Sequence, residues 1–334
     1  GKTTVSCGLA LHLAADYPRE KVLLISTDPA HSLGDMLEVA LGEKRKRLKE
    51  ARGNISTWQI DSATEFQKFL SGNRDSILSI VEKGTFFSRE EIAPLLDTTL
   101  PGMAEVAALL AIHELTGKDE YQRIVVDTAP FGHTLRLFEL PTHFQRFLTF
   151  LEVASSRDAL LAQRFGGRAR RPAHAFLARW QGMVDELTAA FSAENAEILL
   201  VTSPESFSLN EAARSMKALE QSATGMKLGR IVLNRVVTEG GACPRCRMRA
   251  RMSGKARRWL GKHFLGTEVL VGPDPGNPVM GLEFLRRFGE TVFRGKSAKL
   301  EKKPPHAGKL EVRKVDWPVA SSHLLFTIGK GGVG

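Results

Sequence analysis

Glycine- and lysine-rich segments stand at both ends of the 334-residue chain. The chain begins Gly1-Lys2-Thr3-Thr4 and ends with the six residues Gly329–Gly334, which read GKGGVG. When Gly334 is overlapped with Gly1, the two ends read G-K-G-G-V-G-K-T-T, which matches the pattern G-x-x-x-x-G-K-[ST] with an extra lysine after the first glycine. Glycines in this pattern let backbone N–H groups turn toward a polyphosphate. The two ends therefore predict one loop for nucleotide phosphates.

This loop predicts a role for each of its residues. Lys2 is expected to reach the β- and γ-phosphates of ATP, the Thr3 hydroxyl to ligate Mg²⁺, and Thr4 to hold the α-phosphate. The other contacts are expected from the backbone of Gly329, Gly331, Gly332, Val333, Gly334 and Gly1. We expect one period excised from a tandem protein with two such loops, with a circular permutant as the alternative. Either way, residues 323–334 are expected to fold back beside Gly1 and supply the first strand and half of the loop.

Composition restricts the class of protein. Apolar residues make up 43% of the chain, enough for a large core, and no apolar run approaches the ~20 residues of a membrane-spanning helix. Three cysteines are too few for a disulfide scaffold, and a loop of this kind uses cytosolic ATP. We therefore expect a cytoplasmic protein, reaching a membrane only through a partner.

The net charge of +10 is concentrated in three segments, Arg164–Arg171, Arg245–Lys262 and Arg294–Lys314. Such segments are either solvated helix faces and a linker or a surface for an anionic partner. No aromatic residues interleave with the arginines in the way that a nucleic-acid platform needs. We therefore favour solvated faces and expect no specific nucleic-acid partner.

Short apolar runs that end in polar residues alternate with helical stretches. This pattern predicts about six buried parallel strands in a doubly wound α/β sheet, with functional residues at the carboxyl ends of the strands. Residues 1–334 are expected to form one such domain, and Ser297–Pro318 a charged linker. The strands are expected at Lys21–Thr27, Arg123–Asp127, Glu197–Thr202, Arg230–Asn234, Glu268–Val271 and Leu324–Ile328.

Two helical insertions are expected to interrupt this alternation, at about 63–115 and 141–191. The second contains two apolar faces. Core packing is the favoured interpretation of each residue taken singly, but two amphipathic insertions beside one nucleotide site could together build a movable apolar surface. The faces consist of Phe144, Phe147, Leu148 and Leu151, and of Phe176, Trp180, Met183, Val184, Leu187 and Phe191.

Two aspartates follow predicted strands. Asp127 ends a hydrophobic strand, where a carboxylate commonly supports the Mg²⁺ shell, and Asp28 follows the strand after the first helix, where it could orient water on the γ-phosphate. An aspartate after a strand is often only a helix cap. Together with the phosphate loop, the two carboxylates predict an ATP-hydrolysing site.

Longer segments resemble the ArsA/Get family of P-loop ATPases, which comprises arsenite-pump ATPases and targeting factors for tail-anchored membrane proteins. Ser26–Asp35 (STDPAHSLGD) and Asp127–Pro141 (DTAPFGHTLRLFELP) are similar to the switch I and switch II segments of that family. The resemblance covers essentially the whole chain in permuted order and implies a deviant Walker A loop. Further similar segments are Gln59–Phe66, Leu100–Glu105, Cys243–Cys246 and Gly272–Leu282.

The resemblance implies roles for individual residues. Lys330 matches the signature lysine that reaches across a dimer-like interface to the partner's nucleotide, so a second copy or second half of the same ATPase is expected. Asp28 matches the residue that positions the attacking water, and Asp127 the one that supports Mg²⁺. The adenine is expected beside Asn234 and the loop formed by Pro273, Asp274 and Pro275. Ser32 departs from the asparagine common in the targeting factors.

Cys243 and Cys246 are too few for a closed tetrahedral metal site, which needs four ligands. The resemblance implies that two chains, or two halves, share one Zn²⁺ or another soft ion through four thiolates. The alternative is an incidental pair in an arginine-rich turn. Cys7, in the first helix, is expected to be a small buried residue.

Three kinds of cargo remain open. An arsenite pump subunit needs about three clustered thiolates, and the second insertion lacks a cysteine. A tail-anchored client needs an apolar groove, but Met103 and Met183 are the only methionines of the insertions, and the 142–191 block is short. We favour the pump type because the ends resemble a tandem protein, and keep targeting as the alternative. A partition-type ATPase on DNA is a remote third interpretation.

Overall fold

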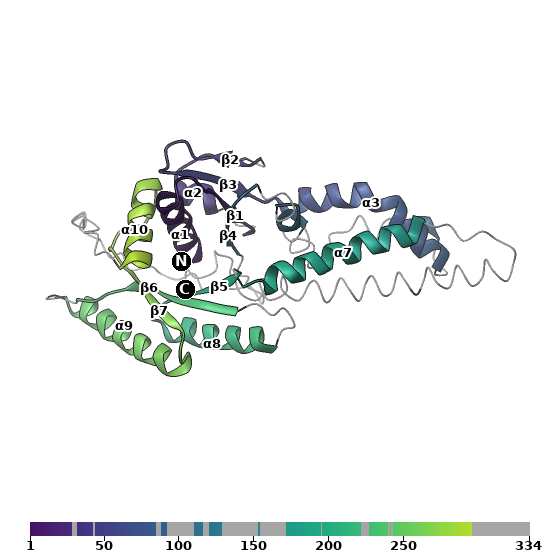
Figure 1. Ribbon diagram of the computed structural model, residues 1–334. Coiled ribbons are helices and arrows are strands. Elements are labelled where there is room, and N and C mark those ends of the chain that lie inside the picture. Colours follow the sequence, from purple (N-terminus) through teal and green to yellow (C-terminus); the bar gives the residue numbers. More distant parts are fainter. Residues whose placement is uncertain are drawn as a thin grey trace, which may run out of the picture. The chain divides into compact units, whose positions relative to one another are not determined.

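The computed structural model describes residues 1–28, 32–42, 44–84, 88–91, 110–115, 120–128, 153, 172–194, 196–221, 227–239, 241 and 243–295 (Figure 1). All of them belong to one compact unit, Gly1–Lys302. Several expectations lie outside the described residues: the strand Leu324–Ile328, the loop Gly329–Gly334 with Lys330, switch II beyond Thr128, the face Phe144–Leu151, and the 297–318 linker.

The first sheet has four strands in the order β2-β3-β1-β4. β1 (Lys21–Ser26) lies between β3 (Asn54–Gln59) and β4 (Arg123–Asp127) and is parallel to both, whereas the short β2 (Lys46–Arg47) is antiparallel to β3. β1 and β4 were expected from their apolar runs, but β2 and β3 were not. β3 has the sequence NISTWQ. The hydroxyl of its buried Thr57 donates a hydrogen bond to the Lys46 carbonyl at 3.3 Å. This polar composition hides the strand.

The second sheet contains β5 (Glu197–Thr202), β6 (Lys227–Val236) and β7 (Glu268–Pro273), all parallel and in that order. The three strands were expected, and β6 and β7 extend beyond the predicted bounds. The expectation of a single sheet is not met by the described residues, in which β4 and β5 are not hydrogen-bonded to each other and two sheets result. The protein is thus α/β with mostly parallel strands.

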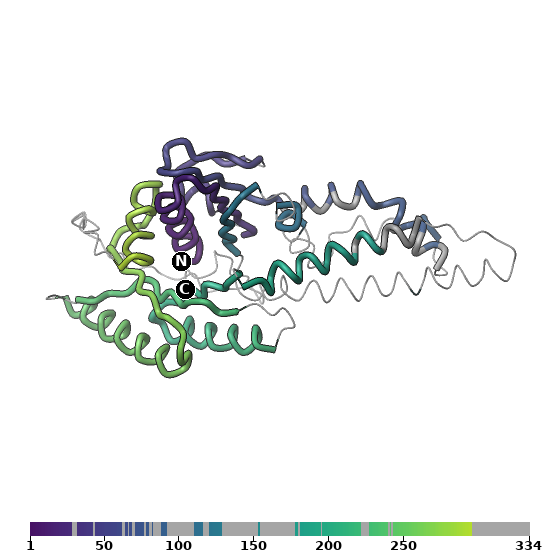
Figure 2. The backbone as a smooth tube through the Cα atoms, viewed as in Figure 1, coloured from purple at the N-terminus to yellow at the C-terminus, as the bar shows by residue number. Residues whose placement is uncertain are grey.

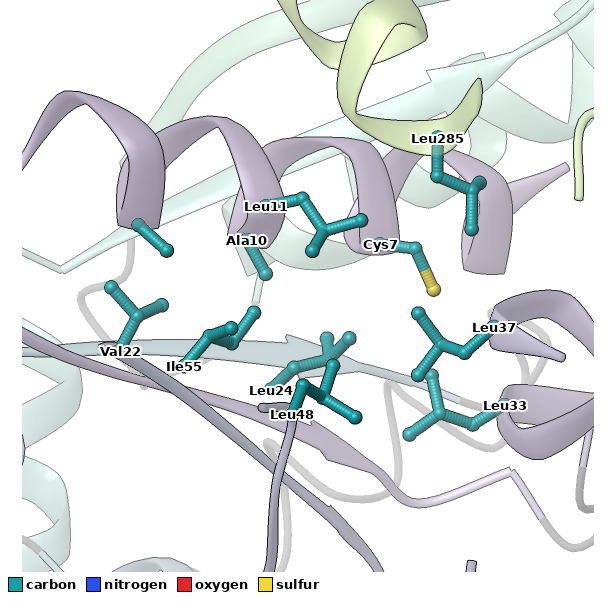
Figure 3. Packing of buried hydrophobic residues seen from close by; sticks show 11 residues of the cluster. Cys7, Ala10, Leu11, Val22, Leu24, Leu33, Leu37, Leu48, Ile55 and Leu285 are labelled. Carbon is teal, nitrogen blue, oxygen red and sulfur yellow. The ribbon is translucent and has the colours of Figure 1, made fainter. Parts of the chain in front are cut away.

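Both faces of each sheet are covered. On β1, Val22 and Leu24 pack beneath α1 (Lys2–Asp16), while Leu23 and Ile25 join the cluster on the opposite face. Figure 3 shows the first of these cores, with Cys7 of α1 buried above the sheet as expected. On β6, Val232 faces α1 and α10 (Leu282–Arg294). Its neighbours Ile231 and Leu233 face α8 (Ser206–Gln221) and α9 (Pro244–His263). This alternation is the period-two pattern of a strand buried on both sides.

The insertions contribute two long helices, α3 (Ser62–Gly84) and α7 (Pro172–Ser192), which lie side by side (Figure 2). A helical segment at 110–115 packs against the C-terminal part of α7. Leu187 and Phe191 are buried in one cluster with it, and Val184 is also buried, so the core-packing interpretation is confirmed for these three residues. Among the described helices, which also include the short α2 (Ser32–Leu37), none is both long and apolar enough to cross a membrane.

Close contact between two glycines allows α1 and α10 to cross. A Cβ added to Gly289 would lie 2.0 Å from the carbonyl oxygen of Gly8, and one added to Gly8 would lie 3.3 Å from the Gly289 Cα. The backbones therefore touch without intervening side chains. Val5, Phe288 and Val292, at 0%, 1% and 3% exposure, pack around this crossing.

This crossing yields a stability prediction. Gly289→Ala would force the two helices apart and is expected to lower the free energy of unfolding by about 3 kcal/mol, the upper range for overpacked cores. The matched control is Gly261→Ala in α9, where an added Cβ meets nothing within 4 Å. That change should alter stability by less than about 1 kcal/mol. Urea denaturation of both variants checks this, and equal midpoints would contradict the proposed role of the crossing.

Candidate functional site

The two sequence-predicted carboxylates lie at one edge of the first sheet. Ser26, at the end of β1, pairs in register with Asp127, at the end of β4. The Thr27 N–H donates to the Asp127 carbonyl at 2.9 Å, and the Asp28 N–H donates to the Ser26 hydroxyl at 3.3 Å. Parallel pairing of β1 with β4 therefore brings Asp28 and Asp127 to the same carboxyl edge, as expected for an α/β site.

Asp127 is 1% exposed, and a carboxylate is rarely buried so completely. Burial raises its pKa to about 6, although hydrogen bonds from Thr3 and Ser6 and the charge of Lys2 act to lower it, and the charge of Asp28 adds to the increase. The Ser6 hydroxyl donates to Oδ1 at 3.1 Å, whereas Oδ2 has no hydrogen-bond partner among the described residues. A buried acceptor of this kind fits a hydrated divalent cation, which would supply the missing donor and the positive charge.

Hydroxyl groups surround this carboxylate. The Thr3 hydroxyl lies 3.4 Å from that of Ser32, the buried first residue of α2. Thr3 and Ser6 are three residues apart on α1 and so share one face of the helix. Sequence reasoning missed Ser6, although this spacing was a usable signal. The hydroxyls of Thr3 and Ser32 with the Asp127 carboxylate form a set of oxygen donors of the type that Mg²⁺ prefers.

The N-terminus of α1 contains the described half of the predicted phosphate loop. Gly1 is the N-cap, and its amino group donates to the Thr4 hydroxyl at 3.2 Å. Thr4 is itself 8% exposed, so it lies mostly inside the first turn. The first N–H groups of a helix have no partner within the helix, and they attract anions. Gly1, Lys2 and Thr3 thus begin a helix whose positive end adjoins Asp127 and Asp28.

The predicted adenine residues lie at the carboxyl edge of the second sheet. Pairing of β6 with β7 is irregular between Leu233 and Val236, and Arg235 adopts a left-handed φ of 59°. Such an irregularity re-aims a side chain. Asn234 here is 6% exposed, and its Oδ1 accepts from the Arg235 N–H at 2.9 Å. Gly272 of β7 leaves room for it, because a Cβ there would lie 2.7 Å from that oxygen.

Asp274 fixes the loop that follows β7. Its N–H donates to the Val236 carbonyl at 2.9 Å, and its Oδ1 accepts from the Gly276 N–H at 2.8 Å. Arg249 of α9 binds the other carboxylate oxygen. Burial raises the pKa of Asp274, but the hydrogen bonds from Arg249 and Gly276 and the charges of Arg249 and Arg235 outweigh it. The result is a pKa below the ordinary value. Sequence reasoning missed Arg249.

Cys243 and Cys246 stand at the start of α9. Cys243 is the exposed N-cap residue, and Pro244 at the first helical position preorganises this terminus. Hydrogen bonds from the Cys246 backbone, the Cys246 side chain and the Arg245 backbone lower the pKa of the Cys243 thiol. In the part of the chain that the structure describes, no group of three or more potential metal ligands gathers. Two thiols are half of the four ligands of a closed tetrahedral site.

Comparison with known proteins agrees with this geometry. The family described as anion-transporting ATPases matches residues 1–294. An ATPase GET3 from Chaetomium globosum is 30% identical over 303 residues, covering 87% of this chain and 86% of that protein. An ATPase get3 from Neurospora crassa is 29% identical, covering 88% and 87%, and an ATPase GET3 from Clavispora lusitaniae is 26% identical, covering 90% and 89%.

The chain belongs to the ArsA/Get family of ATPases. The resemblance of the switch I segment, the cysteine pair and the Gly272–Leu282 segment is thereby confirmed at the level of the family. ATP binding is a property of that family. The match extends from Gly1 to Arg294, the last residue of α10.

A recess lies between the two long helices of the insertions, α3 and α7. It has a volume of about 590 Å³ and is bounded by α3, α7 and the segment 110–115, with apolar Leu110 and Met183 among its lining residues. Two polar links join its walls, because His113 Nε2 lies 2.6 Å from a carboxylate oxygen of Glu186, and Arg179 donates to Asn73 at 2.9 Å. The lining of the recess thus combines apolar side chains with polar and charged ones.

The Arg249–Asp274 pair yields a prediction about nucleotide affinity. Arg249→Met removes the charge that holds the loop after β7 and is expected to weaken ATP binding about fivefold, a modest loss because Arg249 is 43% exposed. Arg257→Met, which removes an exposed α9 cation with no ion pair to a described residue, is the control and should leave the Kd unchanged. Titration calorimetry with a non-hydrolysable ATP analogue checks both. Equal affinities for the two variants would show that the pair does not position the loop.

Proposed function

We propose that this chain is an MgATP-hydrolysing ATPase of the targeting branch of its family, whose nucleotide cycle drives the binding and release of hydrophobic tail-anchored clients. The observation that carries the cargo assignment is the name shared by its similar relatives, ATPase GET3, at 26–30% identity over most of both chains. The buried Asp127 beside Thr3, with one unpartnered oxygen, supports the hydrolytic part.

The favoured pump interpretation is replaced by this targeting interpretation. As(III) prefers about three clustered thiolates, and of the three cysteines of the chain only Cys243 and Cys246 lie together, while Cys7 is buried in α1. The relatives carry the targeting-branch name rather than that of a pump subunit. The anion-transporting description applies to the family as a whole.

In the proposed reaction, the residues of the chain mainly orient and neutralise charge. Lys2 and the N-terminus of α1 hold the β- and γ-phosphates, and Asp28 orients the attacking water. Thr3 and Asp127 hold Mg²⁺ through oxygen donors, and the ion would neutralise charge that develops on the phosphates. Lys330 of a second copy completes the site, so that hydrolysis waits for the two copies to close.

We propose that Leu324–Ile328, which lies outside the described residues, supplies the strand that the sequence predicts before the phosphate loop. Both β4 and β5 are edge strands in the described part of the chain. Their side chains nevertheless share one core, because Ile124 and Val126 of β4 pack in the same cluster as Ile198 of β5.

We further propose that two copies share a Zn²⁺ ion through Cys243 and Cys246 of each. The exposed position of Cys243 and its lowered pKa support this, because a thiolate is the form that binds metal. A shared ion would hold the two nucleotide sites opposite each other, as the role of Lys330 requires.

The hydrolytic assignment predicts distinct defects in two variants. Asp28→Asn should bind ATP normally but hydrolyse it about 100-fold more slowly or worse, because water is no longer oriented. Lys2→Ala should lose nucleotide affinity as well. Glu50→Gln and Lys49→Ala, at exposed positions before β3, are the matched controls and should behave as the parent does. Phosphate release and nucleotide titration check the four variants, and parental hydrolysis by Asp28→Asn would disprove its role.

The cargo assignment predicts stable complexes with a hydrophobic helix peptide and no stimulation of hydrolysis by arsenite. Met183→Glu places a charge in the recess between α3 and α7 and should reduce peptide capture at least tenfold. Phe207→Glu, at a 73% exposed position on α8, is the control for a general loss of apolar surface. Co-purification and ATPase assays check this. Arsenite stimulation that disappears in Cys243→Ser/Cys246→Ser would instead restore the pump interpretation.

A further inference from the structure

α9 presents a continuous stripe of cations to solvent. Its sequence, PRCRMRARMSGKARRWLGKH, contains no acidic residue. At about 100° per residue, the five side chains named below fall within roughly 80° of the helix circumference and extend over about 22 Å along its axis. All five are exposed. We call this set the α9 stripe, and it consists of Arg247, Arg251, Lys255, Arg258 and Lys262.

The opposite face of α9 fixes the direction of the stripe. Ser253, Ala256 and Leu260 are 3%, 1% and 0% exposed and pack toward β6 and α8. The helix therefore cannot rotate to bury or hide its cations. Figure 1 shows α9 and α8 together on one side of the second sheet, so the stripe forms part of the outer surface of this layer.

The charges of the stripe are not neutralised within the described residues. The one ion pair found for α9 there joins Arg249 to Asp274, and Arg249 lies outside the stripe. Five uncompensated cations along one helix face repel one another. Their placement is therefore unfavourable for stability and is best explained by an anionic partner.

Apolar side chains border the stripe on one side. Met248 is 57% exposed, and Leu265, just beyond the end of the helix, is 83% exposed. Half-buried Trp259 lies between them along the chain, at about the same angle around the helix as Met248. Cations beside protruding apolar side chains suit the headgroup layer of a membrane, where the former meet lipid phosphates and the latter enter the acyl boundary.

A nucleic acid fits this surface less well. Single-stranded binding needs an open aromatic platform for bases. The Trp259 ring is stacked on His263 with centroids 3.9 Å apart and is in edge contact with Phe264 at 6.2 Å. The Trp259 ring thus already contacts neighbouring side chains and is not an open platform for a base. Exposed Met248 and Leu265 would also face water beside a phosphate backbone rather than an apolar layer.

We propose that the α9 stripe docks the protein directly on an anionic lipid surface, with Met248 and Leu265 entering the headgroup layer. This docking is independent of the cargo assignment, because it does not involve the recess between α3 and α7. It gives the protein a lipid contact of its own, in addition to any contact through a membrane partner.

Vesicle flotation of the full chain tests the proposal. The protein should float with phosphatidylcholine vesicles containing about 30% phosphatidylserine and remain in solution with phosphatidylcholine alone, since each cation near such a surface strengthens binding roughly fivefold. Arg251→Gln/Lys255→Gln/Arg258→Gln should weaken binding at least tenfold. The control Lys44→Gln/Lys49→Gln/Arg52→Gln removes the same charge from exposed positions before β3 and should bind as the parent does.

Several outcomes would overturn the proposal. Equal weakening by the two triple variants would assign the effect to net charge, and equal flotation with neutral vesicles would exclude an electrostatic surface. Tighter binding to a DNA duplex than to anionic vesicles at the same salt concentration would identify a nucleic-acid surface instead. Leu265→Ser supplies a second readout, because it should reduce the vesicle binding that persists in high salt while ATP affinity and thermal stability stay parental.

Discussion

The contact between α1 and α10 is the constraint on which the rest of the structure depends. α1 must place its N-terminus beside the carboxyl ends of β1 and β4 while it also packs against the second sheet. It does so through Val5, which shares a core with Val232 and Phe288. Only the missing side chains of Gly8 and Gly289 let α10 approach closely enough to close that core. One helix crossing thus holds both sheets around the predicted phosphate-binding end of α1.

Much of this arrangement could be predicted from the sequence, for reasons that are physical. β1 is buried on both faces and β4 and β5 are partly buried, so their apolar runs are continuous and visible. β3 is also buried, but Thr57 and Ser56 mask it, and its parallel pairing to β1 is a long-range property that no local pattern encodes. The division into two sheets was likewise invisible, because it depends on which strands pair rather than on which segments are strands.

The site shows the same division between local and tertiary information. Asp28 and Asp127 could be identified because each ends a recognisable strand, and Asn234 through the family resemblance. Arg249 could not, because its partner Asp274 lies 25 residues further along the chain and meets it only after α9 has folded back along β7. The unpartnered oxygen of Asp127 is also a tertiary property, since it results from complete burial of the strand end.

α9 brings three separate features onto one rigid element. Its N-terminal end carries the cysteine pair, its second turn binds the loop of Asp274, and its outer face carries the α9 stripe. Because Ser253, Ala256 and Leu260 anchor the helix to β6, a displacement at one of these points must move the others. Pairing of two copies at the cysteines, nucleotide contact at the adenine edge and lipid contact at the stripe would therefore be mechanically linked. The linkage would be reciprocal. If one nucleotide state stabilises a given position of α9, a lipid surface that stabilises the same position would in turn stabilise that nucleotide state.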